Sequence, residues 1–413
     1  MSSTAPRADG PPSDGRGPLA GVKVVELGVW VAGPAAGGVL ADWGADVVKI
    51  EPPEGDPARG FAKMLGGDVP FNPPFEMDNR SKRSIVIDLA RDEGRALADE
   101  VLADADVFVT NIRMDALRRL RLDPDTLHAA HPGLVYGIIT GYGLEGPDAD
   151  RAAYDIGAFW ARSGVADLLT PPGGGPPFQR GGQGDHNAGM TLAAGVCAAL
   201  VAHGRTGKGQ LVHTSLLRHG MYTISFDLNT ALRFGVSIGV ATHETMTNPA
   251  INRYQDSDGR WFWLIGLDGE RHWPDLCRSI DRAEWIDDER FATAAARRDS
   301  ISVLIPLLDE QFATRTRDEW GEAFDREGMW WAPVQTPEEV LADPQAWAGG
   351  GFVEVPDGGG TVTMINSPVD FAGTPGAPTA MPPELGQHTD EVLAELGRDP
   401  AAIARLRADG VVA

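Results

Sequence analysis

The sequence is short of cysteine, of positive charge and of long apolar runs. Its two cysteines, Cys197 and Cys277, lie far apart in apolar contexts, so neither a disulfide framework nor a metal-binding spacing is predicted. No run reaches the roughly 18–20 apolar residues of a membrane span. Residues 1–17 are polar, lack the apolar core of a secretory signal and are predicted to be a disordered arm. We therefore expect a cytoplasmic protein with no bound metal and no membrane partner.

Basic residues are outnumbered, with 36 Lys and Arg against 59 Asp and Glu and a net charge of −23. This balance argues against nucleic acid as a partner. An anionic ligand would need positive charge concentrated locally, although a run of basic residues is more often a solvated face. Two clusters qualify as anion sites, namely Arg80, Lys82 and Arg83, and then Arg113, Arg118, Arg119 and Arg121.

Strands and helices alternate in the first half of the chain. Apolar runs that fit buried strands occur at 22–28, 45–51, 84–89, 106–111 and 134–140. The alternation is typical of a parallel, Rossmann-like α/β sheet. The first βα turn lacks the G-x-G-x-x-G fingerprint, so a dinucleotide-dependent oxidoreductase is the weakest of the functions considered. Asn111 and the arginines after it follow a strand directly, where open α/β sheets bind ligands.

The character of the chain changes in its second half. Residues 236–250 are irregular and are interpreted as a linker. A hairpin is predicted around Asp258–Gly259, a strong turn signal between two strands, and several helices follow it. We therefore predict a large domain over 18–235 and a smaller α+β domain over 251–347.

The strongest chemical signal lies in the segment 178–216. Glycines precede Asp185, and a run of small and apolar residues follows it. This pattern predicts that Asp185 is the N-cap of an internal helix, and that Gly189 lets another element approach that helix closely. A carboxylate at this place could instead attack an activated acyl group, with the helix N-terminus holding the oxyanion. The residues alone do not decide between these two roles.

The segment resembles the core of the class III CoA-transferase family, which includes formyl-CoA and carnitine CoA-transferases and the α-methylacyl-CoA racemases. The resemblance covers roughly residues 18–400 and implies a CoA-transferase in which Asp185 carries the acyl group covalently. Further motifs match in order: PLAGVKVVELG (18–28), GPAAGGVLADWGADVVKIEPPEGDPAR (33–59), NRSKRSIVIDL (79–89), GYGLEGPDADRAAYD (141–155) and LGQHTDEVL (385–393).

The resemblance also implies an architecture and a set of CoA contacts. Family members are interlocked homodimers whose large domain contains both the N- and C-terminal parts, so we expect 348–413 to return to the large domain. The positions that match CoA contacts of the family are Asn111, Ile112, Arg113, Ala116 and Arg119. Arg59 is a weaker candidate, with a solvated loop arginine as its alternative.

The sequence departs from the formyl-type members near the expected acyl group. It has Val29–Val31 where those enzymes carry polar residues, and oxalate is therefore not expected as an acceptor. Tryptophans are candidates for the wall of an apolar acyl site, although such residues more often belong to a core. They are Trp30, Trp160, Trp330 and Trp331.

Two alternatives to a CoA-transferase remain, an α-methylacyl-CoA racemase and a noncatalytic CoA-binding homologue. The racemases place a histidine where this chain has Tyr154, and a tyrosine with an ordinary pKa of about 10 is a poor base near neutrality. Asp155 beside it is expected to point elsewhere, and His186 is expected to be structural.

Overall fold

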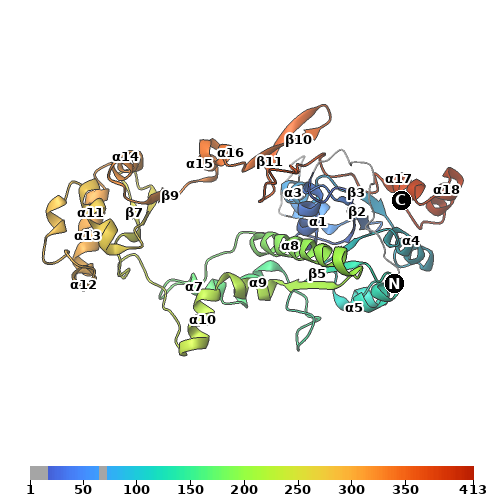
Figure 1. The fold of residues 1–413 in the computed structure, drawn as a ribbon, viewed down its shortest axis with the longest axis horizontal. Helices are drawn as coiled ribbons and strands as arrows, with labels where there is room; N and C mark the ends of the chain where they lie inside the picture. Colours follow the sequence, from blue (N-terminus) through green and yellow to red (C-terminus); the bar gives the residue numbers. More distant parts are fainter. Residues whose placement is uncertain (1–16, 65–71) are drawn as a thin grey trace, which may run out of the picture. The chain divides into compact units, whose positions relative to one another are not determined.

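The structure, a computed structural model, describes residues 17–64 and 72–413, so the arm predicted over 1–17 lies outside the described residues except for Gly17. The chain forms two compact units (Figure 1). One unit contains the chain through Asp167 together with Phe178–Val236 and Gln345–Ala413. The other contains Leu168–Pro177 and Ser237–Pro344. The C-terminal residues therefore fold with the N-terminal part of the chain.

A six-stranded parallel sheet forms the centre of the first unit. The strand order is β3-β2-β1-β4-β5-β6, the doubly wound arrangement that the strand–helix alternation predicts. Because the order reverses between β1 and β4, the loops after these two strands mark the switch point, where open α/β sheets have their ligand-binding crevice. The strands are β1 (Lys23–Leu27), β2 (Asp46–Glu51), β3 (Arg83–Val86), β4 (Val107–Thr110), β5 (Val135–Thr140) and β6 (Leu211–Ser215).

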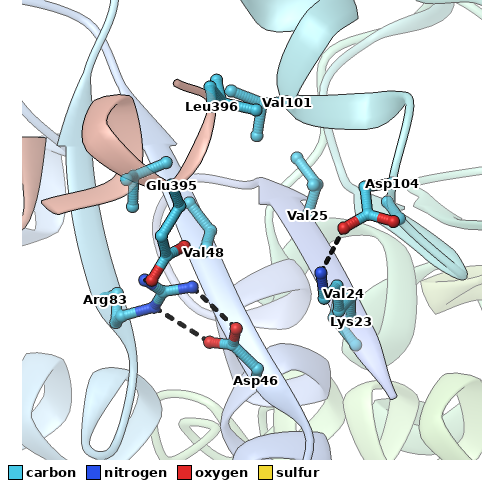
Figure 2. Close-up of a pocket in the computed structure, with 12 residues that line it drawn as sticks. Lys23, Val24, Val25, Asp46, Val48, Arg83, Val101, Asp104, Glu395 and Leu396 are labelled. Carbon is cyan, nitrogen blue, oxygen red and sulfur yellow. Dashed lines mark hydrogen bonds and ion pairs between the residues drawn. The ribbon is translucent and has the colours of Figure 1, made fainter. Parts of the chain in front are cut away.

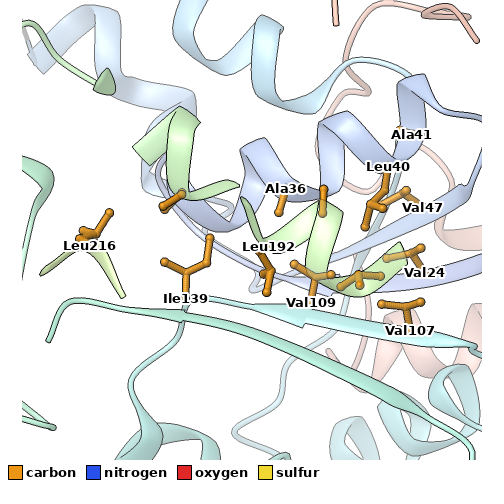
Figure 3. Close-up of a cluster of buried hydrophobic side chains, with 14 of the residues drawn as sticks. Val24, Ala36, Leu40, Ala41, Val47, Val107, Val109, Ile139, Leu192 and Leu216 are labelled. Carbon is orange, nitrogen blue, oxygen red and sulfur yellow. The ribbon is translucent and has the colours of Figure 1, made fainter. Parts of the chain in front are cut away.

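Helices cover both faces of this sheet because its strands are largely apolar. On one face, α1 (Ala32–Asp42) and α8 (Gln183–Thr206) pack on strand residues such as Val24 and Val109 (Figure 3). The other face is covered by α4 (Asp92–Leu102), α5 (Met114–Leu120), α6 (Pro124–Ala130), α17 (Thr389–Glu395) and α18 (Pro400–Ala408). Helix α18 was not among the elements predicted from the sequence.

The second unit is built on a three-stranded antiparallel sheet. Strands β7 (Ile251–Gln255) and β8 (Trp261–Ile265) pair around Asp258–Gly259, which confirms the predicted hairpin. Strand β9 (Trp331–Pro333) completes the sheet. The helices of this unit include α11 (Gly269–Ser279), α12 (Ala294–Asp299), α13 (Ile301–Phe312), α14 (Arg317–Glu327) and α15 (Pro337–Ala342).

The remaining elements are short and mostly connect the larger ones. A second hairpin is formed by the antiparallel pairing of β10 (Phe352–Asp357) with β11 (Gly360–Ile365). The others are η1 (Pro57–Gly60), α2 (Phe61–Met64), α3 (Pro73–Asn79), a π-helix η2 (Ile156–Ala161), α7 (Val165–Leu168), α9 (Leu216–Thr223), α10 (Ser225–Phe234), η3 (Ala283–Ile286) and α16 (Pro344–Ala348).

The start of α8 differs from the prediction. The helix begins at Gln183 with Gly182 as its N-cap, so Asp185 lies within the first turn and is not the cap residue. Gly182 has a φ of +77°, a left-handed conformation that glycine adopts readily. The backbone N–H of Gly184 donates instead to the carboxylate of Asp155, 3.1 Å away. The prediction failed because a residue distant in sequence supplies the cap.

Helix α8 is long and apolar enough to cross a membrane by length and composition alone. Its inner face, however, packs against α1 and β5, and a core helix passes the same test. Gly189 allows the close packing with α1, because a Cβ there would lie 2.8 Å from the Cβ of Ala35 and 3.0 Å from the N of Ala36. The close approach predicted from the small residues of α8 is therefore confirmed at Gly189.

We expect Gly189→Ala to lower the free energy of unfolding by about 1–3 kcal/mol, because overpacking outweighs a gain in helix propensity of about 1 kcal/mol. Gly204→Ala is the matched control on the same helix, where an added Cβ meets no atom within 4 Å. It should be neutral or stabilise by up to about 1 kcal/mol. Urea denaturation followed by circular dichroism measures both, and equal stabilities would contradict the close helix contact.

Candidate active site

The crevice at the sheet's switch point is shaped by Asn111, the residue directly after β4. Its Oδ1 accepts a hydrogen bond from the N–H of Val29 at 3.0 Å, and its Nδ2 donates to the carbonyl oxygen of Val29 at 2.8 Å. A Cβ on Gly33 would lie 2.8 Å from the Asn111 Oδ1, so this glycine permits the contact. The side chain of Asn111 therefore fixes the loop after β1 against the end of β4.

The other residues predicted to contact CoA follow Asn111 into α5. The N–H of Ile112 donates to the hydroxyl of Thr110 at 3.1 Å. Arg113 precedes the helix, Ala116 lies in its first half and Arg119 in its last turn. Among the described residues, neither Arg113 nor Arg119 takes part in an ion pair, and both side chains are exposed. The structure thus brings five of the predicted residues into one segment with available positive charge.

The basic cluster at Arg80, Lys82 and Arg83 does not form an anion site, and this candidate is corrected. Arg80 is buried against Asp42 with an Nη2–Oδ2 distance of 2.7 Å. Lys82 is buried against Glu26 with an Nζ–Oε2 distance of 2.6 Å. Arg83 is bound by acidic residues of two other segments. Each of the three basic groups is paired with carboxylates of the protein, which a linear sequence pattern does not reveal.

The alternative prediction for Arg59, a solvated loop arginine, is wrong. Its guanidinium group donates to Glu51 at 2.8 and 2.7 Å and to the carbonyl oxygen of Pro383 at 3.1 Å. It also lies over the ring of Phe75, 4.5 Å from the centroid. These contacts join the loop after β2 to the C-terminal segment, and a CoA contact by Arg59 stays a prediction.

A buried ion network holds the loop after β1. The Nζ of Lys49 lies 2.9 Å from the Glu26 carboxylate and 3.0 Å from that of Asp56, and all three side chains are 0% exposed. Lys49 also donates to the carbonyl oxygen of Gly28 at 2.8 Å, and Asp56 accepts the N–H of Trp30 at 3.0 Å. Trp30 is thereby held at a φ of +65°, a conformation that bulky residues rarely adopt.

Trp30 is the one predicted tryptophan that lies at this crevice. Its ring makes edge contacts with Phe61 and Tyr154, with centroids 6.3 and 6.0 Å apart. Trp160 is buried in the core, and Trp330 and Trp331 belong to the second unit. Tyr154 is 66% exposed, so the two rings form an aromatic surface open to a ligand.

Asp185 lies in the first turn of α8 in a largely buried environment. Burial raises its pKa to about 7, and the nearby Asp155 acts in the same direction, whereas His186 opposes them. No hydrogen bond to the Asp185 carboxylate occurs among the described residues. The Nε2 of His186 lies 3.1 Å from the Oδ1 of Asp78, and this contact raises the pKa of His186. His186 is therefore held by Asp78, and its structural role stays a prediction.

Asp155 was expected to point away from the site, and this expectation is wrong. Its side chain is buried, its Oδ2 accepts the N–H of Gly184, and its Oδ1 has no hydrogen-bond partner among the described residues. It directly precedes the π-helix Ile156–Ala161, an irregularity that is frequent at functional sites. Sequence reasoning missed this residue because its contact with Gly184 bridges 29 positions.

A separate recess lies at the amino ends of the strands. It has a volume of about 160 Å³ and is lined by charged residues that include Lys23, Asp46 and Arg83, at the starts of β1, β2 and β3 (Figure 2). Arg83 bridges Asp46 and Glu395 there at 2.6 and 2.8 Å. Ligands of open α/β sheets bind at the carboxyl ends, so we place no substrate in this recess.

Comparison with known proteins identifies the family. Residues 19–389 match CoA-transferase family III. Curated relatives include (R)-2-hydroxy-4-methylpentanoate CoA-transferase of Clostridioides difficile, 35% identical over 95% of this chain and 99% of the relative. Another is cinnamoyl-CoA:phenyllactate CoA-transferase of Clostridium sporogenes, 35% identical over 95% of this chain and 96% of the relative.

A solved structure agrees with the sequence matches. A CAIB/BAIF family protein from Brucella suis superposes with a TM-score of 0.81 and 32% identity, over 92% of this chain and 100% of that one. The family match, the two curated relatives and this structure all extend over nearly the whole chain. We conclude that this protein is an enzyme of CoA-transferase family III.

Proposed function

We propose that the protein moves CoA from an acyl-CoA donor to a free carboxylic acid through a covalent intermediate on Asp185. The observation that carries this proposal is the environment of Asp185, a carboxyl group with a pKa of about 7 at the first turn of a buried helix. Perturbed carboxyl groups of this kind mark candidate catalytic groups. A carboxylate of raised basicity is also a better nucleophile than an ordinary one.

The reaction would proceed in two matched halves. The Asp185 carboxylate attacks the donor thioester carbonyl, the C–S bond breaks, and CoA leaves as a thiolate from an acyl–aspartyl anhydride. The thiolate then attacks the aspartyl carbonyl, which releases the donor acid and leaves an aspartyl–CoA thioester. The acceptor carboxylate reverses these steps and leaves with CoA. Backbone N–H groups at the start of α8 are suited to stabilise the oxyanions.

The residues around the crevice favour an apolar acyl group. Trp30 lies in the segment where formyl-type enzymes carry polar residues, and its ring contacts those of Tyr154 and Phe61. The two curated relatives named above act on 2-hydroxy acids or acyl groups with branched or aromatic side chains, as their names state. We infer that this enzyme takes branched or aromatic acids of similar size.

A first test looks for the intermediate. Incubation with cinnamoyl-CoA or 4-methylpentanoyl-CoA, followed by hydroxylamine trapping and peptide mass spectrometry, should place an adduct on Asp185. Asp185→Ala should lose at least about 10³-fold in turnover, because removing a covalent nucleophile abolishes the stepwise route. Circular dichroism of the variant should remain that of the folded protein. Full transferase activity in Asp185→Ala would refute the covalent mechanism.

A proton-exchange experiment separates the transferase from a racemase. A racemase instead needs a second acid–base group, and His186 is held by Asp78 at 3.1 Å. We therefore expect no α-proton exchange of 2-methylacyl-CoA in deuterium oxide, and rapid exchange without an acceptor acid would favour the racemase.

A second test concerns CoA binding by the arginines of α5. Arg119→Ala should raise the dissociation constant of CoA about tenfold or more, because an arginine–phosphate contact is charge-assisted. Arg118→Ala is the matched control on the same helix, since Arg118 already pairs with Asp115 at 3.1 Å. Calorimetry at moderate salt measures both, and an equal effect of the two substitutions would remove Arg119 from the site.

A third test concerns the assembly. Helix α10 has no buried residue and exposes Phe226, Leu232 and Phe234 by 75, 84 and 71%. We propose that a second copy of the chain covers this apolar surface in a homodimer, as the family resemblance implies. Sedimentation equilibrium should give twice the 44.0 kDa of one chain. A folded and active monomer would contradict the proposal.

A further inference from the structure

Asp155 is fixed against the residue that precedes the proposed nucleophile. Its Oδ2 accepts the N–H of Gly184 at 3.1 Å. A Cβ on Gly184 would lie 2.3 Å from the Asp155 Oδ1 and 2.3 Å from the Cγ of Phe159. Glycine at this position is therefore what lets the buried carboxylate reach the first turn of α8, one residue before Asp185.

Three charged groups from three segments act on Asp185. Asp155 acts from the start of the π-helix, Asp78 from α3, and His186 from α8 itself. His186 is hydrogen-bonded to Asp78, so its charge is shared with that carboxylate. Asp155 has a hydrogen bond on its Oδ2 alone, since its Oδ1 is buried without a hydrogen bond in the described chain. Two histidines, His186 and His219, lie close enough to interact with Asp155, and Asp155 in turn acts against the ionised form of Asp185.

We propose that Asp155 is a positioning residue for Asp185, one that takes the helix-cap hydrogen bond for itself and opposes the ionised form of the Asp185 carboxylate. The proposal rests on the covalent mechanism proposed above. Because the Gly184 N–H already donates to Asp155, the oxygens of Asp185 are not needed to accept a hydrogen bond from that N–H. They remain available to a substrate.

The charge of Asp155 also acts on the balance between free enzyme and intermediate. When the Asp185 carboxylate attacks a thioester, the C–S bond breaks and the negative charge leaves with the CoA thiolate. The acyl–aspartyl group and the aspartyl–CoA thioester are both neutral. Repulsion by Asp155 is therefore present in the free enzyme and relieved in each covalent state, which favours formation of the intermediate.

The test is a pH titration of Asp185 that needs no acyl-CoA. A diazoacetamide, which esterifies protonated carboxyl groups, is applied at a series of pH values, and labelling of the Asp185 peptide is measured by mass spectrometry. In the wild type, half-maximal labelling should fall near pH 7. In Asp155→Asn the amide oxygen still accepts the Gly184 N–H but the charge is gone. Ionised Asp185 is then less opposed, and the midpoint should fall by about one pH unit or more.

The matched control is Asp150→Asn, an exposed carboxylate of the preceding loop, which should leave the midpoint unchanged. A wild-type midpoint in the ordinary aspartate range of about 4 would overturn the proposal without any variant. An unmoved midpoint in folded Asp155→Asn would overturn it as well. Failure of the covalent mechanism is seen separately, as the absence of an Asp185 adduct with acyl-CoA donors.

Discussion

The site depends on two lysine ammonium groups buried between carboxylates. Lys49 and Lys82 meet Glu26, and Lys49 also meets Asp56, with no exposure to solvent. Removing one partner from such a network leaves a buried charge uncompensated and typically costs about 3–5 kcal/mol. The network holds Trp30 in its unusual conformation, Trp30 contacts Tyr154, and the next residue, Asp155, binds the start of α8. A continuous set of contacts thus joins the end of β1 to the first turn of α8, which contains Asp185.

Burial acts in the same direction on Glu26 and Asp185, but the net shifts of their pKa values are opposite. At Glu26, burial acts against the charge, but Lys49 and Lys82 outweigh it and keep the pKa below its usual value. At Asp185, burial is reinforced by a second carboxylate and opposed only by His186. An aspartate in the first turn of a helix ordinarily favours its charged form, because the helix N-terminus attracts negative charge. The protein therefore disfavours the charge of Asp185 and compensates that of Glu26.

The sequence predicted the sheet and the second unit's hairpin because hydrophobic periodicity and turn residues are local signals. Asn111 was placed correctly for the same reason, since the end of a strand is visible in the chain. The anion site predicted at Arg80 and Lys82 was wrong because their partners, Asp42 and Glu26, are distant in sequence. The ion pairs with these residues form only in the tertiary structure. The cap of α8 was misjudged because Asp155 supplies it from another segment. Helix α18 had a usable signal, Asp399 followed by Pro400, which fits an N-cap and first helical position.

The discontinuous first unit has a consequence for biosynthesis. One face of its sheet is closed by α17 and α18, whose Val392, Leu393, Ile403 and Leu406 join the apolar cluster around Ile85 and Phe108. Chains emerge from the ribosome N-terminus first, so the whole of Ser237–Pro344 is made before that cover exists. The part of this face that α17 and α18 cover therefore stays exposed during the synthesis of the entire second unit, although α4, α5 and α6 are already made. During that interval the nascent chain is a natural client for chaperones that bind exposed apolar strands.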